Sequence, residues 1–141
     1  MDRLKLVALD TDDLSVISAH CQDAVLRADD IKYYPAEKRL VIALRRFVWD
    51  SARPMARERR LAVLDLERAT AVRTLGIDRR KGDQALALLA ILFKPGDAPS
   101  GEIEFVFSGH CGLRVAVECV EARLADMDAS WEAQSRPSHE S

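Results

Sequence analysis

This sequence has few aromatic residues, few cysteines and no long apolar segment. Its 141 residues include only 6% aromatics and three cysteines. No apolar run approaches the roughly 18 residues that a membrane-spanning helix needs, and the first residues lack the apolar stretch of a secretory signal. We therefore expect a cytoplasmic protein with no membrane partner.

The cysteines and the missing motifs exclude further classes of protein. Cys21, Cys111 and Cys119 are an odd number at spacings that match no disulfide framework, which predicts free thiols in a reducing compartment. The chain has no P-loop, no dinucleotide-binding glycine pattern, no nucleophile elbow and no zinc-protease motif. Nucleotide hydrolysis, dinucleotide binding and the common hydrolase reactions thus have no support, and we expect no cofactor.

The sequence does contain regular alternation of apolar and polar residues, which predicts β-strands. In residues 101–127, apolar residues occupy every second position on either side of an SGHCG turn: Ile103, Phe105 and Phe107 before it, and Leu113, Val115, Val117 and Cys119 after it. A two-stranded hairpin is only marginally stable unless further strands or a helix cover its apolar face. The rest of the chain must therefore supply that cover.

The N-terminal part predicts one strand, one helix and a second hairpin. Residues 4–9 alternate as a short strand, and the acidic cluster at residues 10–13 is typical of a helix start. Apolar and small residues at helical spacing then predict one amphipathic helix: Leu14, Ile17, Ser18, Cys21, Ala24 and Val25. Residues 25–50 read as a hairpin whose second strand either carries a bulge at Arg45 and Arg46 or has both faces partly covered.

Two later segments are compatible with both a helix and a strand. In residues 60–78, β-branched residues at positions 70, 72 and 74 favour one long, bent strand. Residues 84–93 form a nearly unbroken apolar run between turn signals, which favours a central strand buried on both faces. The polar segment 51–60 is predicted to be a loop, and Trp131 to anchor a short helical turn before a disordered tail, residues 132–141.

Together these elements predict a single α+β domain over residues 1–131. It consists mainly of an antiparallel sheet, curved or closed into a half-barrel, with one amphipathic helix near the N-terminus. A chain of this length is ordinary for one domain with its own core.

Four segments carry a resemblance to a known family. They are DLSVISAHCQDAV, then RRFVWD, then GID followed by LALLAILFKPG, and finally GEIEFVFSGHCGLRVAVECVEARLADM. Their order resembles a family of small alphaproteobacterial proteins catalogued as a domain of unknown function, DUF2948. The resemblance spans Leu4 to about Trp131 and implies a compact bacterial cytoplasmic protein, without an activity or catalytic residues. The order of seven strands is also similar to that of pleckstrin-homology-like barrels.

The charges are unevenly distributed, although the net charge is only −2. Residues 38–81 contain 13 Lys and Arg against 5 Asp and Glu, which leaves both flanks acidic. Either the positive charge gathers on one side, where it can steer an anionic partner or pair with another subunit, or basic and acidic strands neutralise each other locally. The candidate binding residues in this segment are Arg45, Arg46, Arg53, Arg57, Arg59 and Arg60. Nucleic acid is an unfavourable partner, because no aromatic residue occurs in residues 51–92.

Candidate chemistry is confined to cysteine and histidine. His110 and Cys111 are adjacent in the glycine-flanked turn, where a thiolate can act as a nucleophile or redox sensor, although a hairpin turn alone explains the glycines. The pairs His20–Cys21 and His110–Cys111 are ligand types that zinc prefers. Adjacent side chains diverge, however, so we expect no metal site.

Two functional hypotheses follow. The first is a non-enzymatic binding or adaptor domain whose basic middle segment binds an acidic protein, another anionic partner or a second copy of the chain. The second is a small enzyme or thiol-based sensor that uses Cys111 and His110. The first is favoured, because no catalytic motif supports the second.

Overall fold

The structure, a computed structural model, describes residues 3–48, 58–78 and 80–127, which form ten strands and one α-helix. The elements in chain order are β1 Lys5–Ala8, α1 Thr11–Cys21, β2 Val25–Arg27, β3 Ile31–Tyr34, β4 Arg39–Val48, β5 Glu58–Glu67, β6 Ala69–Leu75, β7 Ala85–Pro95, β8 Gly101–Phe107, β9 Cys111–Val117 and β10 Ala122–Asp126. Two 3-10 helices, η1 Ala28–Asp30 and η2 Pro35–Glu37, flank β3.

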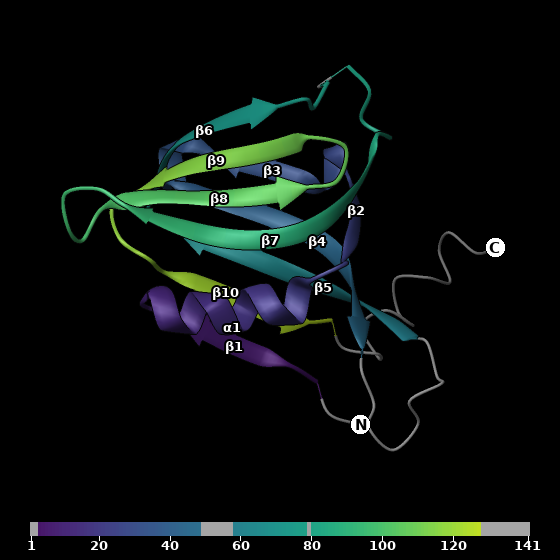
Figure 1. The fold of residues 1–141 in the computed structure, drawn as a ribbon, viewed down its shortest axis with the longest axis horizontal. Coiled ribbons are helices and arrows are strands. Elements are labelled where there is room, and N and C mark those ends of the chain that lie inside the picture. Colours follow the sequence, from purple (N-terminus) through teal and green to yellow (C-terminus); the bar gives the residue numbers. More distant parts are fainter. Residues whose placement is uncertain (1–2, 49–57, 79, 128–141) are drawn as a thin grey trace.

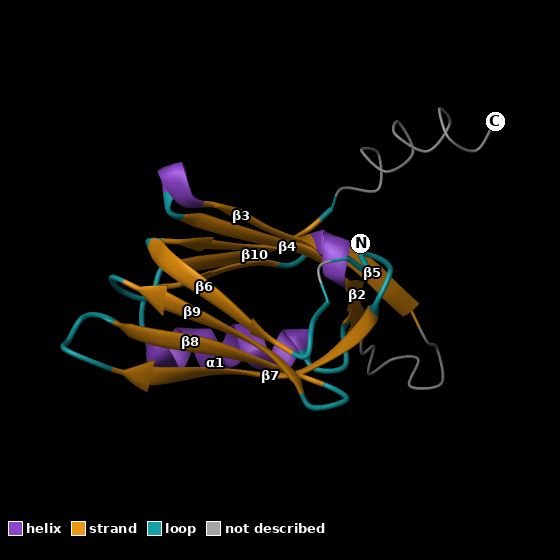
Figure 2. Cartoon of the chain, turned by 90° about the horizontal axis from the view of Figure 1, so that it is seen from above, coloured by secondary structure: helices purple, strands orange, loops and turns teal. Residues whose placement is uncertain are grey.

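The strands form one open, strongly bent antiparallel sheet. Its order is β1-β10-β5-β4-β2-β7-β8-β9-β6, and β3 also pairs with β4. The sheet folds over at the short strand β2, which pairs with both β4 and β7. As a result β3, β4, β5 and β10 form one layer over β6, β7, β8 and β9 (Figures 1 and 2). This confirms the predicted α+β class and the mainly antiparallel, curved sheet.

The core lies between these layers. Alternate residues of the long strands point inward, except where β7 shifts its register between Leu88 and Ala90. The largest fully buried side chains come from both layers and from α1: Leu40, Leu44, Leu64, Leu66 and Leu124 from one layer, Leu88, Ile103, Phe105, Phe107 and Leu113 from the other, and Leu14 and Ile17 from the helix. Helix α1 packs mainly against β7 and β1 (Figure 1). No helix in the described part of the chain is long and apolar enough to cross a membrane.

Helix α1 begins where the acidic cluster predicts it. The side chain of Asp10 accepts a hydrogen bond from the amide of Asp13 at 2.8 Å, and Leu14, Ile17 and Cys21 are buried. The helix ends at Cys21, earlier than the apolar spacing predicts. Asp23 has a φ of 67°, which turns the chain so that Val25 begins β2 and is not part of the helical stripe.

Strand β4 keeps one alternation along its whole length. Its register with β5 runs without a shift from Arg39 opposite Glu67 to Val48 opposite Glu58. The predicted bulge at the two arginines is therefore wrong. The alternative, that both faces are partly covered, holds, because Arg46 is buried on the inner face and Phe47 is half-buried on the outer face.

The two ambiguous segments are strands, as predicted, but they differ in detail. Residues 60–78 do not form one bent strand. The chain breaks at Arg68, which has a φ of 61°, so that β5 and β6 belong to different layers. The predicted loop also ends early, because β5 begins at Glu58. Strand β7 is not buried on both faces, since Leu89 and Leu92 are 44% and 48% exposed on its outer face.

Candidate functional site

The strand geometry separates the arginines of the predicted binding segment. Successive side chains of a strand point to opposite faces of the sheet. Arg45 and Arg59 consequently lie on the outer face, whereas Arg46 and Arg60 lie on the inner face at opposite positions of β4 and β5. Arg53 and Arg57 lie outside the described residues, as do Trp131 and the predicted tail. The basic segment is thus not one continuous surface.

The inner arginines converge on a carboxylate. Arg46 is only 6% exposed, and its Nε and Nη2 donate to the two carboxylate oxygens of Asp126 at 2.6 and 2.7 Å. Arg60 lies 3.8 Å from the same carboxylate, which also accepts a hydrogen bond from the amide of Leu4. Burial alone raises the pKa of Asp126, but the bonds from Arg46 and Leu4 and the charges of Arg46 and Arg60 outweigh it and hold this pKa below its usual range. These arginines therefore neutralise an internal acid.

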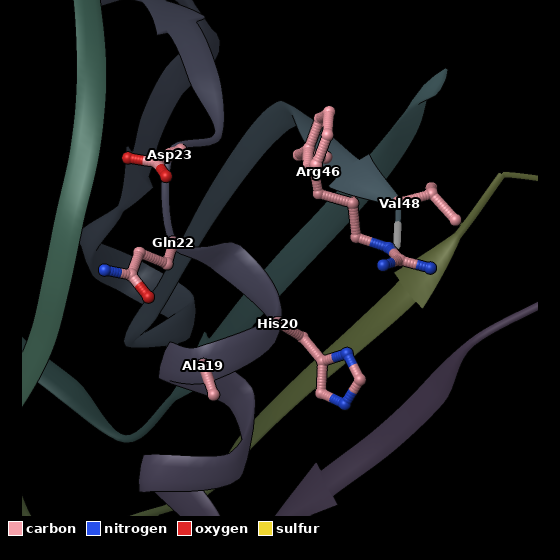
Figure 3. Close-up of a pocket in the computed structure, with 7 residues that line it drawn as sticks. Ala19, His20, Gln22, Asp23, Arg46 and Val48 are labelled. Atoms are coloured by element: carbon pink, nitrogen blue, oxygen red, sulfur yellow. The ribbon is translucent and has the colours of Figure 1, made fainter. Parts of the chain in front are cut away.

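A shallow pocket of about 340 Å³ opens between the end of α1 and the end of β4. Figure 3 shows the His20 ring and the Arg46 guanidinium on the same side of this pocket, one from the helix and one from the strand. Asp23 lies at its other side. The guanidinium is already bound to Asp126, so the pocket adds little attraction for an external anion.

The outer face carries a different group of arginines. We call Arg27, Arg45 and Arg59, together with Phe47, the basic face. Arg45 lies opposite Val25 on β2 and opposite Leu61 on β5. On β2, Arg27 lies two residues after Val25, and on β5, Arg59 lies two residues before Leu61. Both therefore share the outer face with Arg45 and are its diagonal neighbours. Such diagonal side chains are about 7–8 Å apart, and all three arginines are exposed.

Arg59 is held in place by neutral groups. Its guanidinium carbon lies 5.7 Å from the centre of the Phe47 ring, within range of a cation–π contact. Its Nη1 donates to the backbone carbonyl oxygens of Asp23 and Arg45 at 3.0 and 3.4 Å. These contacts fix the position of the charge without neutralising it.

Elsewhere, arginines are paired with acids. Carboxylates lie within 4.0 Å of Arg39, Arg46, Arg60, Arg68, Arg73, Arg80, Arg114 and Arg123. Several of these acids come from the acidic C-terminal flank, including Glu118 and Asp126. Much of the basic segment is therefore neutralised locally. By contrast, Arg27, Arg45 and Arg59 form no ion pair with any residue that the structure describes.

The SGHCG turn is a tight hairpin connection. Three residues, Ser108, Gly109 and His110, connect the last ladder pair, Phe107 and Cys111. Gly109 and His110 have φ values of 72° and 61°, a left-handed backbone that matches the twist of the two strands. The Cys111 thiol is half-buried and donates to the carbonyl oxygen of Gly76 at 3.3 Å, while His110 is exposed. The same sulfur accepts a hydrogen bond from Nε2 of Gln84 at 3.8 Å, so the thiol links the turn to the segment before β7. The thiol hypothesis itself stays a prediction.

No cluster of metal ligands occurs among the described residues. No group of three or more His, Cys, Asp or Glu side chains is suitably placed there. At the first candidate pair, His20 is exposed whereas Cys21 is fully buried, so the two side chains point apart. Burial raises the pKa of the Cys21 thiol to about 12, which fits a small core residue.

The sequence alone does not indicate that Arg27 is a candidate binding residue. This residue lies before the basic segment, and only the pairing of β2 with β4 brings it beside Arg45. The alternation within β4, in contrast, already places Arg45 and Arg46 on opposite faces. The composition of a segment therefore does not show which of its arginines share a surface.

Comparisons with known proteins place the chain in one family. No curated protein and no solved structure matches it. The sequence model of the family described as "Protein of unknown function (DUF2948)" matches residues 4–139, and the chain belongs to this family.

Proposed function

We propose that the protein is a non-enzymatic binding domain whose basic face binds an acidic segment of a partner protein. The observation that carries this proposal is the charge balance of the arginines. Most described arginines have a carboxylate partner, whereas Arg27, Arg45 and Arg59 have none among the described residues. These three share one face, with Arg27 and Arg59 each diagonally beside Arg45. Positive charge that is not neutralised internally attracts an anionic partner.

The arrangement suits an acidic peptide. The three arginines stand on paired strands, which hold them at fixed spacing, and guanidinium groups bind carboxylates with two parallel hydrogen bonds. Phe47 adds an apolar, half-buried surface beside Arg45 and Arg59. Arginine next to aromatic surface is typical of the centre of protein interfaces.

Nucleic acid is a less suitable partner for this face. Single-stranded nucleic acid is usually bound by several aromatic side chains on which bases stack. Phe47 is the aromatic residue of the basic face, and Arg59 already lies over its ring. A second copy of the chain remains an alternative, with acidic residues of one copy against the arginines of the other.

The test is binding of a fluorescent ten-residue oligoglutamate, followed by anisotropy. We expect binding at about 0.01 M salt that is lost near 1 M, because the Debye length falls from about 30 Å to about 3 Å. The double substitution Arg27→Ser with Arg45→Ser should weaken binding by about tenfold or more, as charge-assisted contacts are lost.

The matched control removes the same net charge elsewhere. Arg73 and Arg114 are exposed but lie beside Glu102 and Glu104 on the outer face of the other layer. The double substitution Arg73→Ser with Arg114→Ser should change binding by less than about twofold. Equal losses in the two double variants would mean that the peptide responds only to overall charge, and the proposal would be wrong. Sedimentation velocity on the wild type separates a peptide-binding monomer from a self-associating protein.

A further inference from the structure

A groove of about 460 Å³ lies between the edge strands β3 and β6. In the described part of the chain β3 pairs only with β4, and β6 pairs only with β9. The sheet therefore stays open between them (Figure 2). The floor of the groove is apolar and consists of Ile31, Val72, Ile77 and Leu113. A volume of this size falls within the range of about 300–1,000 Å³ typical of small-molecule sites.

Both ends of the groove are closed by hydrogen bonds. At one end the Tyr33 hydroxyl donates to the carbonyl oxygen of Ala69 at 2.9 Å, which links β3 to β6. At the other end the amide of Asp29 donates to the carbonyl oxygen of Gly82 at 2.9 Å. An extended peptide rises about 3.3 Å per residue and needs an open path along a strand. The closed ends therefore favour a compact ligand.

Two opposite charges stand at the rim. Asp29 and Lys32 line the groove, both are exposed, and neither has an ion-pair partner within the described ranges. Lys32 alternates with Ile31 and Tyr33, so its side chain starts on the outer side of the edge strand β3 and reaches the rim from there. The carboxylate of Asp29 rests against Gly82, where a Cβ atom would overlap it. Glycine at this position thus permits the carboxylate to stay beside the groove. A ligand that fits here meets one anion, one cation and an apolar floor.

We propose that this groove binds a small zwitterion with an apolar side chain, of the type of a free leucine-like α-amino acid. Its carboxylate pairs with Lys32, its ammonium group pairs with Asp29, and its side chain lies on the apolar floor. A purely apolar ligand would cover both charges without compensating them, which is costly. A simple anion would pair with Lys32 but meet repulsion from Asp29. The zwitterion is the class that matches every charged group of the lining.

This site is separate from the basic face. No residue of the groove belongs to the set Arg27, Arg45, Phe47 and Arg59. The domain would then carry a small-ligand site in addition to its proposed protein-binding surface. Success or failure of one proposal leaves the other unaffected.

Three ligands that differ by one charge provide the test. Free leucine carries both charges, leucinamide lacks the carboxylate and N-acetyl-leucine lacks the ammonium group. We expect leucine at about 10 mM, a concentration suited to Kd values near 1 mM, to shift the backbone NMR signals of Ile31, Val72 and Ile77. Each analogue should bind about fivefold to tenfold more weakly, because it loses one charge-assisted contact.

Single substitutions then assign each charge. Lys32→Gln should make leucine and leucinamide bind equally, and Asp29→Asn should make leucine and N-acetyl-leucine bind equally. Lys5→Gln and Asp97→Asn remove the same charges on β1 and in the turn after β7, and should preserve the order of the three ligands. The proposal is overturned if leucine leaves the groove signals unchanged, or if Lys32→Gln and Asp29→Asn preserve that order. Dispersed spectra of the variants confirm that each is folded.

Discussion

Arg46 and Asp126 are 80 positions apart in the sequence and form a two-point ion pair inside the protein, with Nε and Nη2 at 2.6 and 2.7 Å from the carboxylate oxygens. Strand β5 lies between their two strands in the sheet, so the pair spans a third strand. Arg46 continues the inward row of Leu40, Ile42 and Leu44, and an arginine is tolerated there because Asp126 meets it. The pair also ties the last described strand to the centre of its layer.

Asp126→Ala should destabilise the protein by about 3–5 kcal/mol, since it leaves the buried Arg46 charge without its main partner. Urea unfolding followed by circular dichroism measures this change. Arg46→Met combined with Asp126→Leu removes both charges and should recover most of the lost stability. Glu104→Ala, which removes a more exposed ion-pair partner of Arg114, should cost about 1 kcal/mol or less. If Asp126→Ala costs no more than that control, the pair has no structural role.

The same carboxylate makes stability depend on pH. The pKa of Asp126 is lowered in the folded protein, so its contribution is present above the unfolded pKa of about 3.9 and is lost as the pH falls through the lower folded value. Between about pH 5 and pH 3, wild-type protein should therefore lose more stability than Asp126→Asn, which cannot titrate at this position. Parallel pH curves for the two proteins would contradict the lowered pKa.

The thiols should differ in reactivity. Burial raises the pKa of Cys21 to about 12, and its side chain is fully buried, whereas Cys111 and Cys119 are half-buried. Iodoacetamide at about pH 8 should modify Cys111 and Cys119 in the native protein, and Cys21 only after unfolding, because the thiolate is the reactive form. Mass spectrometry of the peptides reads out each site. Modification of Cys111 alone well below pH 8 would instead favour the thiol-based function.

Asp10→Ala should cost about 1 kcal/mol, because the aspartate side chain satisfies the free amide of Asp13 at the start of α1. Asp12→Ala is the matched control, since Asp12 lies in the same turn but makes no such capping bond, and its loss should cost about 0.5 kcal/mol. Thermal unfolding compares the two variants. Equal costs would show that charge near the helix start matters and that the cap does not.

Local sequence patterns predict best those strands and helices whose apolar periodicity lies wholly within one element. The apolar–polar alternation around the SGHCG turn predicts β8 and β9, and the acidic cluster at residues 10–13 predicts the start of α1. The break at Arg68 depends on where β6 can pair, because Ala69 and Ala71 join β9, about 45 residues away in the chain. No local pattern encodes such a partner, so β5 and β6 are read as one strand.

The exposure of β7 side chains likewise depends on strand pairing that no local pattern encodes. An unbroken apolar run predicts burial on both faces, yet Leu89 and Leu92 lie on the open outer side of a bent sheet. A shift in the pairing of β7 with β8 between Leu88 and Ala90 changes which residues point outward. The candidate sites also depend on the arrangement of the strands. Arg27 lies beside Arg45 because β2 pairs with β4, and the groove forms because β3 and β6 lie near each other.

Tyr33→Phe tests how these two edges are held together. The hydroxyl of Tyr33 donates to the carbonyl oxygen of Ala69, and phenylalanine keeps the ring but removes this bond. The variant should lose about 0.5–1.5 kcal/mol of stability, and the amides of β6 should exchange with solvent faster, because an edge strand held by one neighbour opens more easily. Tyr34→Phe is the control, since Tyr34 is exposed on the opposite face and its hydroxyl makes no hydrogen bond within the described chain. Unchanged exchange of β6 in Tyr33→Phe would mean that pairing with β9 alone holds this strand, and that the groove between β3 and β6 can widen.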